Sequence, residues 1–86
     1  MAYSVEIYPE ALKALAALPK ADRRRVAEKI EALGTNPRPA GAKALQGSDK
    51  GHMRLRTGDY RIVYRIENKR LLVLVIRIGN RKEVYR

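Results

Sequence analysis

The stretch HMRLRTGDYRIVYRI, residues 52–66, decides the fold of this 86-residue chain. Apolar and polar residues alternate on both sides of Gly58-Asp59, and a period of two is typical of β-strands. A glycine that leads a two-residue loop suits a type II′ turn. The sequence therefore predicts a β-hairpin with strands at residues 52–56 and 60–66.

The register of this hairpin predicts two different faces for the sheet. Residue 57 is expected to face residue 60, and residue 56 to face residue 61; directly opposed residues share a face. One face then carries the basic side chains of His52, Arg54, Arg56, Arg61 and Arg65. The other face carries the expected core residues Met53, Leu55, Tyr60, Ile62 and Tyr64.

A third strand is expected over residues 70–78, with its register left open by the loop before it. A two-residue loop (Asn68-Lys69) and a three-residue loop (residues 67–69) give this strand opposite faces. We expect the longer loop, because it places Arg77 with the other basic residues. Apolar residues at 71–76 predict a central strand covered on both sides. Gly79-Asn80 is expected to turn into a last segment at residues 82–85.

The N-terminal half begins with a short alternating stretch at residues 3–7, which predicts a strand. Pro9 suits the first turn of a helix, and Pro19 ends that helix. Apolar residues at positions 26, 30 and 33 predict a second helix, from about Asp22 to Gly34. Two helices joined this closely form an antiparallel hairpin.

Residues 35–51 are a connection rich in proline and glycine, with one helical turn expected at 42–46. The whole order is strand, helix, helix and three strands. It predicts an α+β domain in which the helical hairpin packs on one face of a small antiparallel β-sheet.

The net charge of +10 is concentrated in the second half of the chain. Residues 51–86 hold ten basic and three acidic side chains, so they carry +7 of that charge. A small, arginine-rich domain of this kind most often binds a polyanion, such as RNA, DNA, an acidic membrane or an acidic protein.

Other classes are excluded by residues that the chain lacks. Without cysteine there is no disulfide framework and no thiol nucleophile, and the one histidine is too few for a catalytic zinc site. We expect no metal and no cofactor. The N-terminus does not read as a secretory signal, and the longest apolar run, six residues, is far shorter than a membrane span of about 20. A cytoplasmic protein without a membrane partner is expected.

The motifs resemble those of one known family. They are KALQG at residues 43–47, RLRTGDYRIVY at 54–64 and IGNRKEVY at 78–85. In this order, after the two helices, they resemble the RelE/ParE superfamily of bacterial toxins, and the ending Gly-x-Arg-x-x-x-Tyr points to its RelE branch. The resemblance covers the whole chain and implies one RelE-like toxin domain at residues 1–86.

The resemblance implies a function, a mechanism and a set of residues. RelE-branch toxins are endoribonucleases that cut messenger RNA in the ribosomal A site without a metal, through attack of the RNA 2′-hydroxyl on the adjacent phosphate. By position, Arg61 matches the arginine that stabilises the phosphate, Arg81 the leaving-group acid or charge clamp, and Tyr85 the residue that stacks on a base. His52 and Arg54 fall where relatives commonly carry two lysines. Arg56, Arg65 and Arg77 are expected to contact substrate.

The departure at His52 and Arg54 raises the question of the general base. A guanidinium does not readily accept a proton at neutral pH, because it stays protonated. An imidazole accepts one more easily. We therefore hypothesise that His52 takes or shares the role of the base.

Two other functions remain open, and the expected binding partners depend on which function is correct. A ParE-like toxin would inhibit DNA gyrase by binding, without catalysis. A basic RNA-binding module would have the same fold and bind RNA without cutting it. For the RelE-like reading, the partners are mRNA, the 70S ribosome and a cognate acidic, RelB-like antitoxin that forms a hetero-oligomer with the toxin. Binding of that antitoxin is expected to be tight and sensitive to salt.

Overall fold

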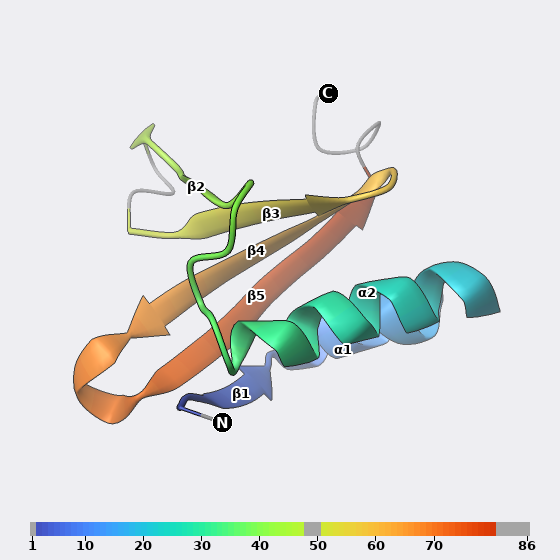
Figure 1. Ribbon diagram of the computed structural model, residues 1–86. Coiled ribbons are helices and arrows are strands. Elements are labelled where there is room, and N and C mark those ends of the chain that lie inside the picture. Colours follow the sequence, from blue (N-terminus) through green and yellow to red (C-terminus); the bar gives the residue numbers. More distant parts are fainter. Residues whose placement is uncertain (1, 48–50, 81–86) are drawn as a thin grey trace.

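Two helices cover one face of a five-stranded sheet (Figure 1). The computed structural model describes residues 2–47 and 51–80. The elements in chain order are β1 (Ser4–Ile7), α1 (Pro9–Ala16), α2 (Lys20–Leu33), β2 (Lys43–Ala44), β3 (Met53–Thr57), β4 (Tyr60–Glu67), a 3₁₀ turn (Asn68–Arg70) and β5 (Leu72–Asn80). The α+β class and the helical hairpin are confirmed. No helix among the described residues is long and apolar enough to cross a bilayer.

The sheet is mixed, whereas the sequence predicted an antiparallel one. Its strand order is β1-β5-β4-β3-β2. The edge strand β1 runs parallel to β5, with Ser4 beside Leu72 and Ile7 beside Val75. Two hairpin turns fix the direction of β5, and β1 joins its free edge from the far end of the sequence. No local pattern reports that pairing.

The β3–β4 hairpin has the predicted register. Thr57 pairs with Tyr60, and Arg56 pairs with Arg61. Gly58 has a φ of +60°, while Asp59 stays on the negative side, which fits the predicted type II′ turn.

The β4–β5 hairpin differs from the prediction in its loop. Glu67 pairs with Leu72, so four residues connect the strands, with Leu71 in the left-handed region at a φ of 48°. Because the loop is one residue longer than predicted, the first half of β5 has its faces reversed relative to the prediction, and Val73 and Val75 face the core. A bulge at Ile76, opposite the step from Val63 to Tyr64, restores the expected faces further along.

Two further expectations about the sheet are wrong. The helical turn predicted at residues 42–46 is instead strand β2, in which Lys43 pairs with Arg54 of β3. The turn predicted at Gly79-Asn80 is the end of β5, which continues to pair with β4 as far as Asn80. In both places pairing to a neighbouring strand outweighs the local turn residues.

Strand β5 is a central strand buried on both faces, as the sequence predicts, although both described helices lie on one side of the sheet (Figure 1). Leu72 and Leu74 are nevertheless 4% and 8% exposed on the other side. Their neighbours in register are Glu67 and Arg65, whose long side chains form an ion pair there. The apolar stems of such side chains can cover a sheet while their charged ends stay in water.

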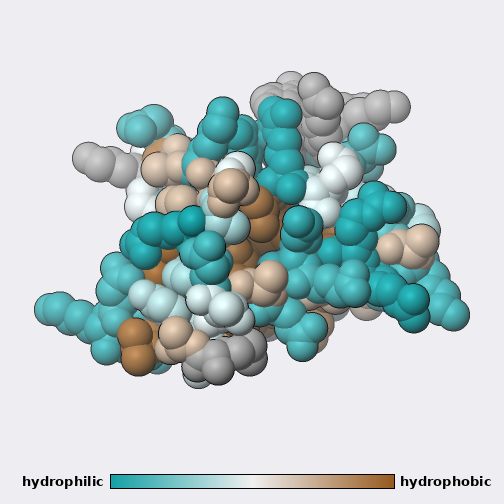
Figure 2. Space-filling model, viewed as in Figure 1, coloured by the Kyte–Doolittle hydropathy of each residue, from teal (hydrophilic) through white to brown (hydrophobic). Residues whose placement is uncertain are grey.

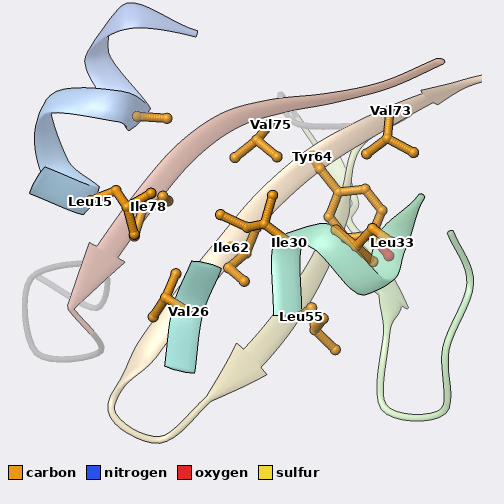
Figure 3. Close-up of a cluster of buried hydrophobic side chains, with 11 residues drawn as sticks. Leu15, Val26, Ile30, Leu33, Leu55, Ile62, Tyr64, Val73, Val75 and Ile78 are labelled. Carbon is orange, nitrogen blue, oxygen red and sulfur yellow. The ribbon is translucent and has the colours of Figure 1, made fainter. Parts of the chain in front are cut away.

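The core lies between the helices and the sheet (Figure 3). Its helical residues follow the 3.6-residue period, and its sheet residues come from β3, β4 and β5. The helices contribute Ala11, Leu15, Val26, Ile30 and Leu33, and the sheet contributes Leu55, Ile62, Tyr64, Val73, Val75 and Ile78. The apolar set predicted for the hairpin is confirmed: Leu55, Ile62 and Tyr64 are buried, and Met53 and Tyr60 pack against them.

Tyr64 ties the proline-rich connection to the sheet. Its hydroxyl donates a 2.7 Å hydrogen bond to the carbonyl of Pro37, and burial raises the pKa of Tyr64 to about 12 from 10.0. Below pH 10 the phenol is neutral in both states. Between pH 10 and 12 it ionises in the unfolded chain first, so this contribution to stability falls as pH rises.

Tyr64→Phe is expected to lower the free energy of unfolding at pH 8 by about 1–2 kcal/mol, because the buried Pro37 carbonyl loses its donor. The loss should shrink between pH 10 and 12, since the phenylalanine has no proton to release. Urea unfolding at pH 8 and 11 measures both effects, and Tyr8→Phe at an exposed tyrosine is the control. A difference that stays constant with pH would contradict the account.

The tip of the β3–β4 hairpin is held against α2. The hydroxyl of Tyr60 donates a 3.1 Å hydrogen bond to Asp22, and Asp22 lies 4.0 Å from Arg25. A Cβ on Gly58 would stand 2.8 Å from Nη1 of Arg25. Gly58 is therefore required chiefly for its φ, although a Cβ there would also displace the flexible end of Arg25.

Gly58→Ala is expected to lower the free energy of unfolding by about 1–2 kcal/mol, the cost of the left-handed conformation for a residue with a Cβ. Arg25 must also move, although its flexible end can do so cheaply. The double variant Gly58→Ala/Arg25→Ala separates the terms by chemical unfolding. If Gly58→Ala costs nothing with Arg25 present or absent, the assigned turn is wrong.

Candidate nucleic-acid interface

The side of the sheet away from the helices gathers basic residues from four strands. We call it the basic face, and its members are Lys43, His52, Arg54, Arg56, Arg61, Arg65 and Arg77. The pairing of the strands fixes their arrangement. One row crosses the sheet through Lys43, Arg54, Val63 and Arg77, and the next runs through Arg56, Arg61 and Gly79.

The two rows place like charges close together. Arg56 and Arg61 are directly opposed, as are Lys43 and Arg54. Opposed side chains in an antiparallel pair have Cβ atoms about 5 Å apart, where like charges destabilise a sheet. Such a concentration of positive charge is typical of a surface that binds a polyanion.

Burial on the basic face is graded around Arg61. This side chain is only 5% exposed, whereas Arg54 is half-buried and Arg56 and Arg77 are exposed. Its neighbour on β5 is Gly79, which puts no side chain beside it. A guanidinium that is buried in this way is held in one place.

Arg65 forms an ion pair at the exposed end of the basic face. It donates a 2.8 Å hydrogen bond to Glu67, which also binds Arg70 at 3.1 Å. The hydrogen bond from Arg65 lowers the pKa of Glu67, with a further contribution from the charge of Arg70. This ion pair lies further along β4 than the two rows, because Arg65 is opposite Leu74 whereas the rows cross β5 at Arg77 and Gly79.

His52 lies immediately before β3, on the same side as Arg54 by alternation. Its carbonyl accepts a 2.9 Å hydrogen bond from the backbone of Leu45. Its ring is half-buried, and among the described residues Nδ1 has no hydrogen-bond partner. In this part of the chain no three His, Cys, Asp or Glu side chains gather in a way that could hold a metal ion.

Six of the eight residues expected from the sequence share the basic face, namely His52, Arg54, Arg56, Arg61, Arg65 and Arg77. Arg81 and Tyr85 lie outside the described residues. Sequence reasoning missed Lys43. A two-residue strand shows no periodicity, so the only local signal was its place in the KALQG motif.

The fold is that of RelE structures. The archaeal RelE–RelB complex of Pyrococcus horikoshii contains a chain that superposes with a TM-score of 0.82 at 32% identity, over 94% of this chain and 97% of that one. Residues 5–85 match the family described as the ParE toxin of the type II toxin–antitoxin system parDE. The protein therefore belongs to this family, within the RelE/ParE superfamily.

Two relatives extend over nearly the whole chain. A RelE1 toxin candidate of Methanocaldococcus jannaschii is 34% identical, over 100% of this chain and 98% of its own length. The mRNA interferase toxin RelE of Escherichia coli is 31% identical, over 99% of this chain and 92% of its own. Both carry RelE names, while the family description names ParE.

Proposed function

We propose that this protein is a ribosome-dependent endoribonuclease toxin that acts in the cytoplasm and inhibits translation by cutting mRNA in the ribosomal A site. The observation that most strongly supports this function is the environment of the buried Arg61. It lies on a face with six other basic side chains, directly opposite Arg56. The name mRNA interferase of the E. coli relative agrees with the proposal.

The proposed reaction takes its nucleophile from the RNA. The 2′-oxygen forms a bond to the adjacent phosphorus while the bond from phosphorus to the 5′-oxygen breaks, leaving a 2′,3′-cyclic phosphate and a 5′-hydroxyl. A base takes the 2′-hydroxyl proton, an acid protonates the 5′-oxygen, and positive charge stabilises the phosphorane.

Each of these tasks has a candidate in the chain. Arg61 is proposed to stabilise the phosphorane, with Arg54 beside it, and Arg81 to serve the leaving oxygen. Tyr85 is proposed to stack on the substrate base. Arg56, Arg65, Arg77 and Lys43 are proposed to bind phosphates of the flanking RNA.

The experiment that tests the function is cleavage of a defined mRNA with and without programmed ribosomes, by wild type and Arg81→Ala. An initial incubation in EDTA, followed by Mg²⁺ restored for the ribosome, tests for a tightly held metal. We expect cutting at the A-site codon, only with ribosomes and only by wild type. Cutting of free mRNA at the same rate would contradict the ribosome dependence.

His52→Ala is expected to lower the single-turnover rate on the ribosome by about 10²–10⁴-fold, the usual contribution of a general base. The half-buried imidazole lies immediately before β3, on the same side of the sheet as Arg54, which places a proton acceptor at the proposed site. A pH–rate profile of wild type and His52→Gln reports whether the loss of rate at low pH, the acidic limb, belongs to this group. An unchanged rate in His52→Ala, with Tyr85→Phe crippled, would assign the base elsewhere.

The second candidate is a toxin that inhibits DNA gyrase by binding. The observation that favours it is the family description, which names the ParE toxin. Inhibition of gyrase supercoiling by the protein, with mRNA left intact on ribosomes, would support this function and overturn the nuclease.

An acidic antitoxin is the proposed protein partner, as RelB is for RelE in the P. horikoshii complex. A cavity of about 360 Å³ between the helices and β1, lined by apolar residues such as Val5, Leu15 and Ile30, suits the apolar side of an amphipathic helix. Acidic residues of the same partner would cover the basic face. Binding that ignores salt entirely would argue against the electrostatic part.

A further inference from the structure

Tyr8 is an exposed aromatic residue at the border of the basic face. It follows β1 in an extended conformation, with φ −63° and ψ 150°, and its N–H donates a 2.9 Å hydrogen bond to the carbonyl of Val75. The alternation of β1 therefore continues through Tyr8, on the side of Ser4 and Glu6 and away from the helices. Its side chain is 42% exposed, so it is not a core residue.

The strand register places Tyr8 near the β5 end of the row that contains Arg77, Arg54 and Lys43, one residue out of line with Arg77. Ile7 pairs with Val75, so Tyr8 lies alongside Ile76 and next to Arg77. From the spacings of strands and residues, its Cα is roughly 14 Å from that of Arg61. At the 3.4 Å rise of stacked bases this is about four nucleotides of one strand.

The electrostatic neighbourhood agrees with this placement. The pKa of Arg65 is raised, chiefly by its hydrogen bond to Glu67 and the charge of that carboxylate, and to a smaller extent by Tyr8. This weak contribution agrees with the face that the alternation of β1 gives Tyr8, since Arg65 lies on the basic face of β4.

We propose that Tyr8 is a stacking platform for a base of single-stranded RNA whose phosphates lie over the basic face. The proposal rests on the RNA-binding function proposed above and adds a base subsite to it. Aromatic side chains beside a positively charged groove bind single strands in this way, because every base has a π-face. The nearby carboxylate of Glu6 repels phosphates but not an uncharged base.

The test is binding of a fluorescent hexamer of 2′-O-methyl adenosine, which cannot be cut because the 2′-hydroxyl is blocked. Tyr8→Ala is expected to weaken binding about tenfold, and Tyr8→Phe less than twofold. Leu12→Ala, at an exposed residue one helical turn away, is the matched control and should bind like wild type. A hexamer of the same backbone without bases should not distinguish Tyr8→Ala from wild type.

The salt dependence separates stacking from phosphate contact. Tyr8→Ala should leave the slope of log affinity against log salt unchanged, while Arg77→Ala should reduce it by about one. Equal affinities of wild type and Tyr8→Ala for the adenosine hexamer, or an equal loss on the hexamer without bases, would overturn the proposal. The proposal would also be overturned if Tyr8→Ala and Leu12→Ala both bound RNA like wild type but bound an acidic protein partner more weakly.

The outcome is distinguishable from a failure of the nuclease function. The probe reports binding alone, so loss of the Tyr8 effect refutes the base subsite whether or not the protein cuts mRNA. A protein that binds the hexamer through Tyr8 but leaves mRNA intact on ribosomes retains the subsite and loses the nuclease function.

Discussion

Arg61→Ala is expected to reduce cleavage on programmed ribosomes by about 10²–10³-fold, the effect of removing one preorganised donor from a developing negative charge. Arg61 is 5% exposed and pairs with Gly79 in register, so the position of its side chain is set before substrate arrives. A fixed charge costs no reorganisation during the reaction. The loss should therefore appear in the rate of the chemical step.

Single-turnover cleavage with saturating ribosomes measures that step. Arg61→Lys is expected to recover part of the rate, because it keeps the charge but loses the planar fork. Arg24→Ala is the matched control, since it removes an exposed arginine from α2 on the other side of the sheet. A folded Arg61→Ala protein that cuts as fast as wild type would remove this arginine from the site.

Ile62→Ala, one residue further along β4, is expected to lower the free energy of unfolding by about 3–4 kcal/mol. Ile62 is fully buried and packs against the helices, as Figure 3 shows. The substitution removes apolar contacts and leaves a cavity. Small domains are stable by only about 5–15 kcal/mol, so this one change threatens the fold.

Chemical unfolding followed by circular dichroism measures the loss. Leu12→Ala, at a leucine that is 52% exposed, removes a similar volume and should cost less than about 0.5 kcal/mol. A small effect of Ile62→Ala would contradict the assignment of Ile62 to the core. Adjacent residues on β4 thus divide the two roles, since Arg61 serves the basic face and Ile62 the core.

The β3–β4 hairpin could be predicted from the sequence because one local feature fixed it. The Gly58-Asp59 turn sets the register, and the alternation on both sides then assigns every side chain to a face. Placement of His52, Arg54 and Arg61 on one side followed from that argument alone.

The β4–β5 hairpin shows where the same argument fails. Parity carries through a strand only while its pairing is regular, and the bulge at Ile76 reverses it. The prediction therefore placed Arg77 on the correct face of the sheet even though it assumed a loop of the wrong length. Val73 and Val75, before the bulge, point to the face opposite to the one that loop implies.

Long-range pairing left no signal in the sequence. The parallel alignment of β1 with β5 joins opposite ends of the chain, and β2 is too short for periodicity. Lys43 lies in β2, and Tyr8 directly follows β1. For this reason neither entered the predicted site, although Lys43 lies in the row of Arg54 and Arg77 and Tyr8 lies close to the other end of that row.

The surface on the helix side has a different character from the basic face. Figure 2 shows it as mostly hydrophilic, with apolar atoms visible between the teal side chains. A cavity of about 480 Å³ opens here between α2 and the connection after it, lined by Leu33, Pro39 and Leu55 among others.

The central claim is that the RNA supplies the nucleophile and the basic face supplies the charge. The most direct test uses a programmed ribosome whose mRNA carries one 2′-deoxynucleotide at the A-site position that is cut. The account predicts that wild-type protein cuts the all-ribose message to a 2′,3′-cyclic phosphate and leaves the substituted message intact. Cutting of the substituted message at the same position would show another nucleophile and contradict the account.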